Sequence, residues 1–211
     1  MKKIYTAIFA VSLIFISCNK EKKEKIATKE EVKSEKVVAV NNIDLEASYM
    51  TWKGTKPGGA HDGTIGFKES SLVLDNGKIT GGEFLVDMAT MKNLDIEDPK
   101  KSANLISHLS NADFFDITTY PTSKFIITSV EDNNGVLAVT GNLTVKDVTK
   151  SITIPASISE QEGVVTFKSE VFNIDRADFN VKYGSKKWFD NLKDRFIDDL
   201  VEMSFVVKTK I

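Results

Sequence analysis

Few side chains in this 211-residue sequence are suited to chemistry, and their spacing favours binding over catalysis. The only histidines are His61 and His108, which lie far apart in the chain. Two isolated histidines without a neighbouring cysteine make a poor transition-metal site, so we expect no metal. His61 follows two glycines and an alanine, where it could hydrogen-bond a polar group of a ligand or cap backbone groups in a bend.

Arg176, in the segment NIDR, is the charged residue best suited to recognising an anion. A guanidinium pairs well with a phosphate or a carboxylate. It could equally form a structural ion pair with Asp175, Asp178 or Asp199. Asp199 falls on the apolar phase of the last expected strand, where a buried carboxylate needs a partner. Arg176 or Arg195 could supply that partner.

Enzyme motifs are missing from the sequence. It contains no Gly-x-Ser-x-Gly, no His-Glu-x-x-His and no Gly-x-x-x-x-Gly-Lys. The composition, with 41% hydrophobic residues and a net charge of -2, is that of about one globular domain and gives no sign of nucleic-acid binding. We therefore predict a binding protein that is not an enzyme and needs no cofactor.

The N-terminus resembles a bacterial lipoprotein signal. A basic start, MKK, precedes an apolar run that is shorter than the roughly 20 residues of a membrane span. The run ends at Phe15-Ile16-Ser17-Cys18, which places the single cysteine where a lipobox requires it. The resemblance implies a signal peptide over residues 1–17, lipidation of Cys18, and anchoring in the cell envelope. The expected site is the outer membrane, on its periplasmic face or at the cell surface. The alternative is an ordinary signal peptide with an incidental cysteine.

Residues 18–41 contain alternating Lys and Glu and no aromatic residue. Such a composition cannot bury a core, so it predicts a disordered tether after the lipidated cysteine. Lys/Glu-rich residues at this place also resemble a signal for export to the cell surface.

Residues 42–211 are expected to form one all-β domain. Short runs with alternating apolar residues recur between turn signals, which predicts about eight strands. Asn76-Gly77 is a strong hairpin signal. One helix is expected from Pro99 to about Ser110, with Asp98 as its N-cap. The pattern predicts an antiparallel sheet that closes on itself or folds as a sandwich. Closure into a barrel is favoured because it removes exposed edges, and side chains or one elongated ligand can fill a barrel of this size.

Five segments of this domain carry a resemblance to a known family. They are GGAHDGTIGF, GGEFLVDMATM, HLSNADFFDITTYPTSKF, VTGNLTVKDVTKSITIP and VFNIDRADF. In order and spacing they resemble the YceI-like family of bacterial polyisoprenoid-binding proteins. The resemblance implies an extended, eight-stranded antiparallel, lipocalin-like barrel with one short helix region near a mouth. It also implies an apolar tunnel for an isoprenoid chain, such as a quinone tail or a polyprenyl phosphate, and no reaction. A homodimer is compatible with the resemblance.

The implied tunnel requires inward-facing apolar side chains. Met and Phe suit a flexible hydrocarbon because they make broad contacts without needing polar partners. The residues expected to line it are Trp52, Phe67, Phe84, Met88, Ile126, Leu143, Phe167, Met203 and Phe205. We expect His61 and Arg176 near a headgroup, and Phe114 and Phe115 across one mouth. Each of these residues could instead serve only ordinary core packing.

Three other functions remain open at this point. The barrel could bind fatty acids or fatty amides, since a hydrocarbon tunnel distinguishes chains poorly. It could be an enzyme that acts on a lipid headgroup. It could also be a structural surface lipoprotein whose packed interior has no continuous void.

Overall fold

Alternating apolar residues build nine antiparallel strands in a computed structural model that describes residues 23–33 and 42–210. One α-helix and two short 3-10 helices accompany the strands. In chain order, the elements are β1 Tyr49–Lys56, β2 Gly59–Asp75, β3 Lys78–Asn93, α1 Pro99–Ser110, β4 Thr122–Asn133, β5 Val136–Val145, β6 Val148–Gln161, β7 Val164–Ser169, β8 Phe172–Asp175, η1 Arg176–Phe179, η2 Lys193–Arg195 and β9 Leu200–Lys210.

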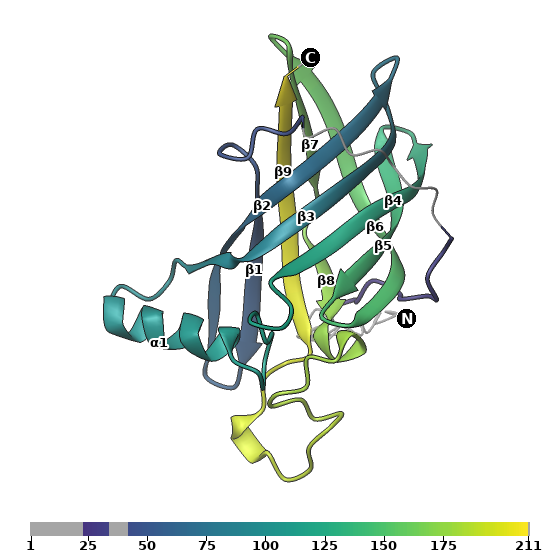
Figure 1. Ribbon diagram of the computed structural model, residues 1–211. Coiled ribbons are helices and arrows are strands. Elements are labelled where there is room, and N and C mark those ends of the chain that lie inside the picture. The colour runs from purple at the N-terminus through teal and green to yellow at the C-terminus, as the bar shows by residue number, and fades with distance from the viewer. Residues whose placement is uncertain (1–22, 34–41, 211) are drawn as a thin grey trace, which may run out of the picture.

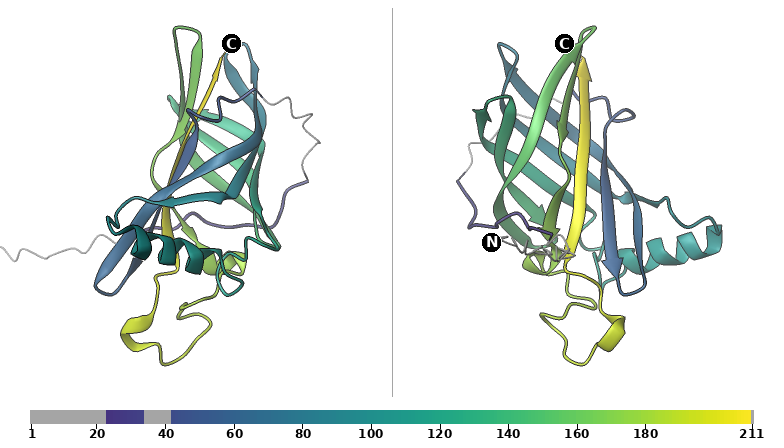
Figure 2. Two further views of the ribbon diagram at one scale, coloured as in Figure 1. Left: turned by 60° about the vertical axis from the view of Figure 1, so that its left-hand side comes forward. Right: turned by 180° about the vertical axis from the view of Figure 1, so that it is seen from behind.

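The sheet closes on itself as a barrel (Figures 1 and 2). Its strands follow the order β1-β2-β3-β4-β5-β6-β7-β9, and β9 returns to pair with β1. Strand β8 lies along the same edge of β9 as β7, so the two act as one interrupted strand. The prediction of an eight-stranded antiparallel barrel with one short helix is therefore confirmed.

Aromatic rings form the centre of the barrel. Phe84 lies between Phe67 and Phe167, with ring centroids 6.2 and 6.0 Å away. Phe167 in turn contacts Phe205 at 4.8 Å. These four buried rings come from four strands, β2, β3, β7 and β9, so they tie opposite walls together.

Local signals place the turns and the helix where the sequence predicts them. Asn76 and Gly77 both have positive φ, 49° and 76°, as a two-residue hairpin turn requires. The carboxylate of Asp98 accepts hydrogen bonds from the backbone N–H groups of Lys100 and Lys101 and so caps α1.

One end of the barrel carries most of the irregular structure. Helix α1, residues 111–121 and the long loop of residues 180–199 all lie at this end, which we call the mouth (Figure 1). We call residues 180–199 the mouth loop. The sequence places Asp199 in the last strand, but β9 begins one residue later, at Leu200. The carbonyls of Ile197 and Asp198 accept hydrogen bonds from the Arg176 side chain, and the backbone N–H of Asp198 donates to Thr55 of β1.

The prediction of a disordered tether over residues 18–41 does not hold for residues 23–33, which we call the strap. The strap lies against the outside of the barrel, where Lys29 and Ser151 exchange two backbone hydrogen bonds of 2.9 Å. The amide of Asn142 closes a second pair of bonds with the backbone of Val32. Composition alone misses such docking because these bonds use the strap's backbone. Within residues 23–33 and 42–210, no helix is both long and apolar enough to cross a membrane. The predicted signal peptide and Cys18 lie outside the described residues.

Candidate functional site

A cavity of about 540 Å³ occupies the barrel interior and reaches the mouth. Apolar side chains from all nine strands, from α1 and from the mouth loop line most of it. Ligand pockets of this kind usually fall in the range of about 300–1,000 Å³. The barrel is therefore not fully packed, and its free space is surrounded by hydrocarbon.

The structure brings nearly all of the predicted ligand-binding residues to this cavity. The residues among them that line it are Trp52, His61, Phe67, Phe84, Met88, Phe114, Phe115, Leu143, Phe167, Arg176, Met203 and Phe205.

Ile126 is the exception, and the prediction that it lines the cavity is wrong. Its neighbours Phe125 and Ile127 are buried in the core, and Phe125 lines the cavity. The pairing of β4 with β5 shifts register between Ile127 and Ser129. Such a bulge switches the faces of a strand, so counting by twos from Val130 assigns Ile126 to the wrong side.

Sequence reasoning also missed lining residues that follow β8. Phe179, Val181 and Tyr183 come from η1 and the mouth loop. Phe179 and Val181 are almost fully buried. These residues have no strand periodicity, so no pattern could have assigned them. For Phe179, the available signal was its place in the segment VFNIDRADF, which resembles the YceI-like family.

Phe114 and Phe115 lie where the cavity meets the mouth. Their ring centroids are 5.1 Å apart, and Phe114 is buried. The Phe114 ring also contacts His108 of α1 at 5.8 Å and Tyr183 of the mouth loop at 6.0 Å. Both phenylalanines therefore border the cavity, and Phe114 also connects α1 to the mouth loop.

Arg176 lies beside the cavity, but its guanidinium is engaged by the protein. Its Nε, Nη1 and Nη2 groups donate to three backbone carbonyls at 2.8–3.1 Å, those of Asp198, Val181 and Ile197. Nη2 also lies 3.4 Å from a carboxylate oxygen of Asp199. Of the three carboxylates considered as partners of Arg176, Asp199 is the one within ion-pair distance of its guanidinium. This arrangement is that of a structural arginine.

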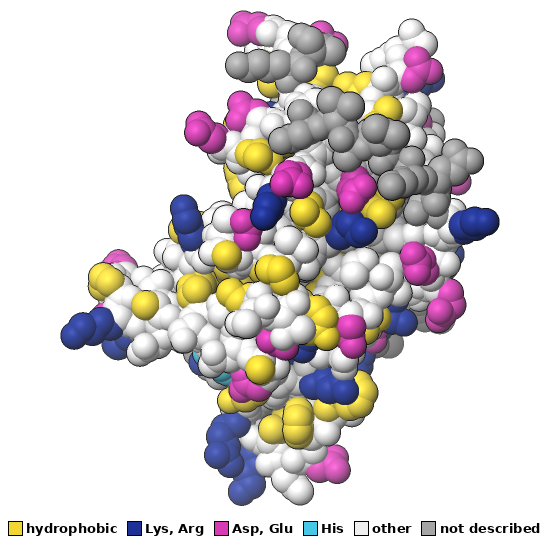
Figure 3. Space-filling model, in the orientation of Figure 1, with side chains coloured by type: hydrophobic (Ala, Val, Ile, Leu, Met, Phe, Trp, Pro, Cys, Tyr) yellow, Lys and Arg dark blue, Asp and Glu magenta, His cyan; other side chains and the backbone are white. Residues whose placement is uncertain are grey.

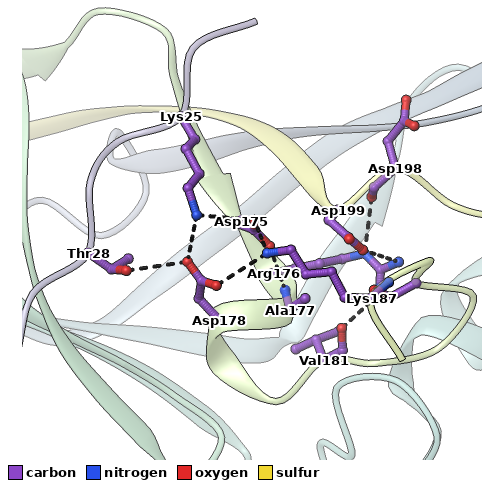
Figure 4. A network of polar contacts seen from close by, with 11 residues as sticks. Lys25, Thr28, Asp175, Arg176, Ala177, Asp178, Val181, Lys187, Asp198 and Asp199 are labelled. Atoms are coloured by element: carbon purple, nitrogen blue, oxygen red, sulfur yellow. Dashed lines mark hydrogen bonds and ion pairs between the residues drawn. The ribbon is translucent and has the colours of Figure 1, made fainter. Parts of the chain in front are cut away.

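Carboxylates next to Arg176 hold the strap and the mouth loop together (Figure 4). Asp175 accepts a 2.5 Å hydrogen bond from Lys187, and Lys25 of the strap lies 3.1 Å from Asp178. Burial disfavours the charged amine of Lys187, but the hydrogen bond and charges of Asp175 and Asp178 raise its pKa overall. This network therefore joins the strap to a part of the chain about 150 residues later, residues 175–187.

His61 lies at the rim of the cavity and bonds Asp95. The distance from His61 Nδ1 to Asp95 Oδ2 is 2.8 Å. The backbone N–H of Asp62 and the amide of Asn93 also donate to Asp95. Desolvation opposes ionisation of Asp95, but these hydrogen bonds lower its pKa to about 2. The free imidazole nitrogen, Nε2, is the atom of His61 left to contact a ligand.

Two buried polar atoms in the cavity wall have no hydrogen-bond partner among the described residues. They are the indole Nε1 of Trp52 and the hydroxyl of Thr55. An unpaired buried donor or hydroxyl is costly, so both atoms are natural contacts for a polar group of a ligand. Among the residues that the structure describes, no cluster of three or more His, Cys, Asp and Glu side chains could hold a metal ion.

The profile of the YceI-like domain matches residues 41–209. The chain belongs to the YceI-like family. It is 33% identical to Protein YceI of Shigella flexneri over 100 residues, which cover 47% of this chain and 46% of that protein. It is 30% identical to a UPF0312 protein of Pseudomonas putida over 127 residues, 58% of this chain and 64% of that protein. The alignments thus span less than two thirds of these relatives' own lengths.

Solved structures share the YceI-like fold. BcnA of Burkholderia cenocepacia superposes with a TM-score of 0.66 at 22% identity, covering 80% of this chain and 100% of that chain. A polyisoprenoid binding domain from Saccharophagus degradans superposes with a TM-score of 0.58 at 15% identity, covering 80% of this chain and 97% of that chain.

Proposed function

We propose that this YceI-like domain binds an isoprenoid or a similar long-chain apolar lipid inside its barrel. The observation that carries the proposal is the cavity of about 540 Å³ with its apolar wall. Moving a hydrocarbon chain out of water is favourable by about 25 cal/mol per Å² of buried surface, less the cost of ordering the chain. The similarity to the polyisoprenoid binding domain of Saccharophagus degradans supports the choice of ligand class.

The few polar atoms in the wall suggest where a headgroup would lie. Trp52 Nε1 and Thr55 Oγ1 are unpaired, and His61 borders the same cavity. A quinone or phosphate headgroup carries oxygen atoms that could accept a hydrogen bond from the indole. These groups recognise and hold a ligand, so the domain would act as a carrier, a store or a sequestering protein without transforming its cargo.

Lipidation of Cys18 would keep this binder at a membrane of the cell envelope, with the outer membrane as the expected site. Only four residues separate Cys18 from Lys23, the first residue of the strap. Five peptide steps span at most about 18 Å. Lys23 pairs with Glu202 on the barrel wall. The docked strap would therefore hold the barrel close to the lipid surface. A free tether of 24 residues would allow the barrel to move away from it.

Native mass spectrometry of the full chain, followed by solvent extraction and lipid analysis, tests the proposal. We expect a bound mass that extracts as an isoprenoid quinone or a polyprenyl lipid. A fatty acid or fatty amide would retain lipid binding and replace the ligand class. A ligand-free mass that takes up no added quinone would contradict the proposal and favour a structural barrel.

A further inference from the structure

The mouth loop exposes two large aromatic side chains at the end of the barrel where the cavity opens. Trp188 and Phe189 are 51% and 48% exposed. The loop itself borders the cavity through Tyr183, Phe196 and Ile197. Adjacent exposed aromatic residues of this size are unusual on a surface that faces only water and indicate an interaction site.

Hydrogen bonds fix the backbone that carries these two rings. Trp188 and Phe189 both donate their backbone N–H groups to the carbonyl of Ser185, which is fully buried. Lys187, between them and Ser185, is tied to Asp175. The exposure of the rings is therefore a feature of an ordered turn.

Basic side chains surround the aromatic residues. Residues 182–196 contain five basic and two acidic side chains, a net charge of +3, while the whole chain has a net charge of -2. Asp198 and Asp199 complete the mouth loop and bring its net charge to +1, and Asp199 pairs with Arg176. The Nζ atoms of Lys182 and Lys186 lie over the rings of Trp188 and Phe196, 3.9 and 3.3 Å from the ring centroids. Figure 3 shows dark blue and yellow side chains gathered at this lowest part of the molecule.

We propose that the mouth loop docks on the surface of an anionic phospholipid bilayer, so that the cavity opens towards the membrane. Trp and Phe rings insert at the level of the headgroups, and Lys and Arg side chains contact anionic phosphates. The local positive charge on a chain of net negative charge selects an anionic partner, and its place beside the mouth selects a partner that contains the cargo. The inference rests on the proposed function for the identity of that cargo.

The two tryptophans of the chain allow a test that separates docking from cargo binding. Trp188 reports on the loop and Trp52 on the cavity. The full chain is reconstituted with vesicles that contain brominated phospholipids, which quench tryptophan on contact. In the Trp52→Phe variant, we expect Trp188 fluorescence to be quenched on anionic vesicles and not on zwitterionic vesicles. In the Trp188→Phe variant, quenching of Trp52 reports entry of a lipid chain into the barrel, which tests the proposed function independently.

A matched pair of charge variants tests the electrostatic part. Lys193 and Arg195 form no ion pair with a described residue, so replacing both with Gln in the Trp52→Phe background should lower the docked-to-undocked ratio about 25-fold, or about fivefold per charge. Replacing the exposed Lys78 and Lys168 with Gln changes the net charge equally and should leave the ratio unchanged. Absent quenching of Trp188 on anionic vesicles, or equal quenching on both vesicle types, would overturn the docking proposal whatever Trp52 reports.

Discussion

At the scale of single residues, the polar groups around the cavity divide into those that the protein already uses and those that remain available. Arg176 belongs to the first group, since three carbonyls and Asp199 surround its guanidinium. Trp52 Nε1 and Thr55 Oγ1 belong to the second. A charged side chain in a cavity wall is therefore not by itself evidence of a ligand contact.

Replacing Arg176 with Met tests its structural role. The variant leaves the carboxylate of Asp199 partly buried without its partner, so we expect a loss of about 3–5 kcal/mol in the free energy of unfolding. Arg195→Met changes an exposed arginine of the same mouth and should cost less than about 0.5 kcal/mol. Urea denaturation measures both. Wild-type stability in Arg176→Met, together with lost lipid binding, would instead identify Arg176 as a headgroup contact.

The pair of His61 and Asp95 predicts a pH dependence of stability. The pKa of Asp95 falls from 3.8 to about 2 on folding, so the ionised carboxylate stabilises the fold above about pH 4. This contribution is lost as the pH falls towards 2. For a partly exposed group we expect Asp95→Asn to cost about 1 kcal/mol at pH 7 and progressively less below pH 4. Urea titrations across this range check the trend, and a cost independent of pH would contradict it.

At the scale of elements, the side chains of two asparagines of the barrel hold the strap. Asn142 in VTGNLT and Asn173 in VFNIDR both belong to segments that resemble the YceI-like family. Asn173 donates to the carbonyl of Glu24 and accepts a backbone bond from Ile26 through its own carbonyl. Asn142 is buried and pairs with both backbone groups of Val32. These two asparagines therefore hold the strap on the outside of the barrel.

Asn142→Ala should release the strap. Losing the two hydrogen bonds should lower the free energy of unfolding by about 1 kcal/mol and speed amide exchange at Val32 about 5–10-fold. Asn133→Ala, at an exposed hairpin tip, is the matched control and should change neither. Hydrogen exchange followed by mass spectrometry measures the effect. Unchanged exchange at Val32 would mean that Asn142 does not hold the strap.

The elements also show which features a sequence can predict. The Asn76-Gly77 turn and the cap at Asp98 depend on neighbouring residues, so both were predictable. The face of Ile126 was not, because the bulge in β4 depends on pairing with β5. The docking of the strap depends on contacts over more than 100 residues of sequence, such as Val32 with Asn142, which local patterns do not encode.

At the scale of the whole molecule, closure of the sheet creates an interior that its own side chains do not fill. The barrel wall is continuous because β9 pairs with both β1 and β7. The cavity reaches the mouth. Helix α1 and the mouth loop lie at that end of the barrel (Figure 1). The proposed lipid chain would therefore enter the barrel at the mouth.

Filling the cavity near its mouth should block binding without unfolding the barrel. Gly54 lines the cavity, and a Cβ atom built there meets no atom within 4 Å. Gly54→Leu should therefore keep the wild-type melting temperature and weaken lipid binding at least tenfold, or about 1.4 kcal/mol. Gly59→Leu is the control, because Gly59 is equally free of neighbours but lies outside the cavity wall. Unaltered binding in Gly54→Leu would argue that the lipid does not pass this position.

The central claim is that an apolar chain lies inside the barrel, and photocrosslinking tests it most directly. An isoprenoid that carries a diazirine at the end of its chain is bound to the full protein, irradiated and mapped by peptide mass spectrometry. We predict labels on deep lining residues, Phe84 of β3 and Phe167 of β7 among them. Labels confined to the exposed residues of the mouth loop, or to the outer face at Ile126, would contradict a ligand inside the barrel.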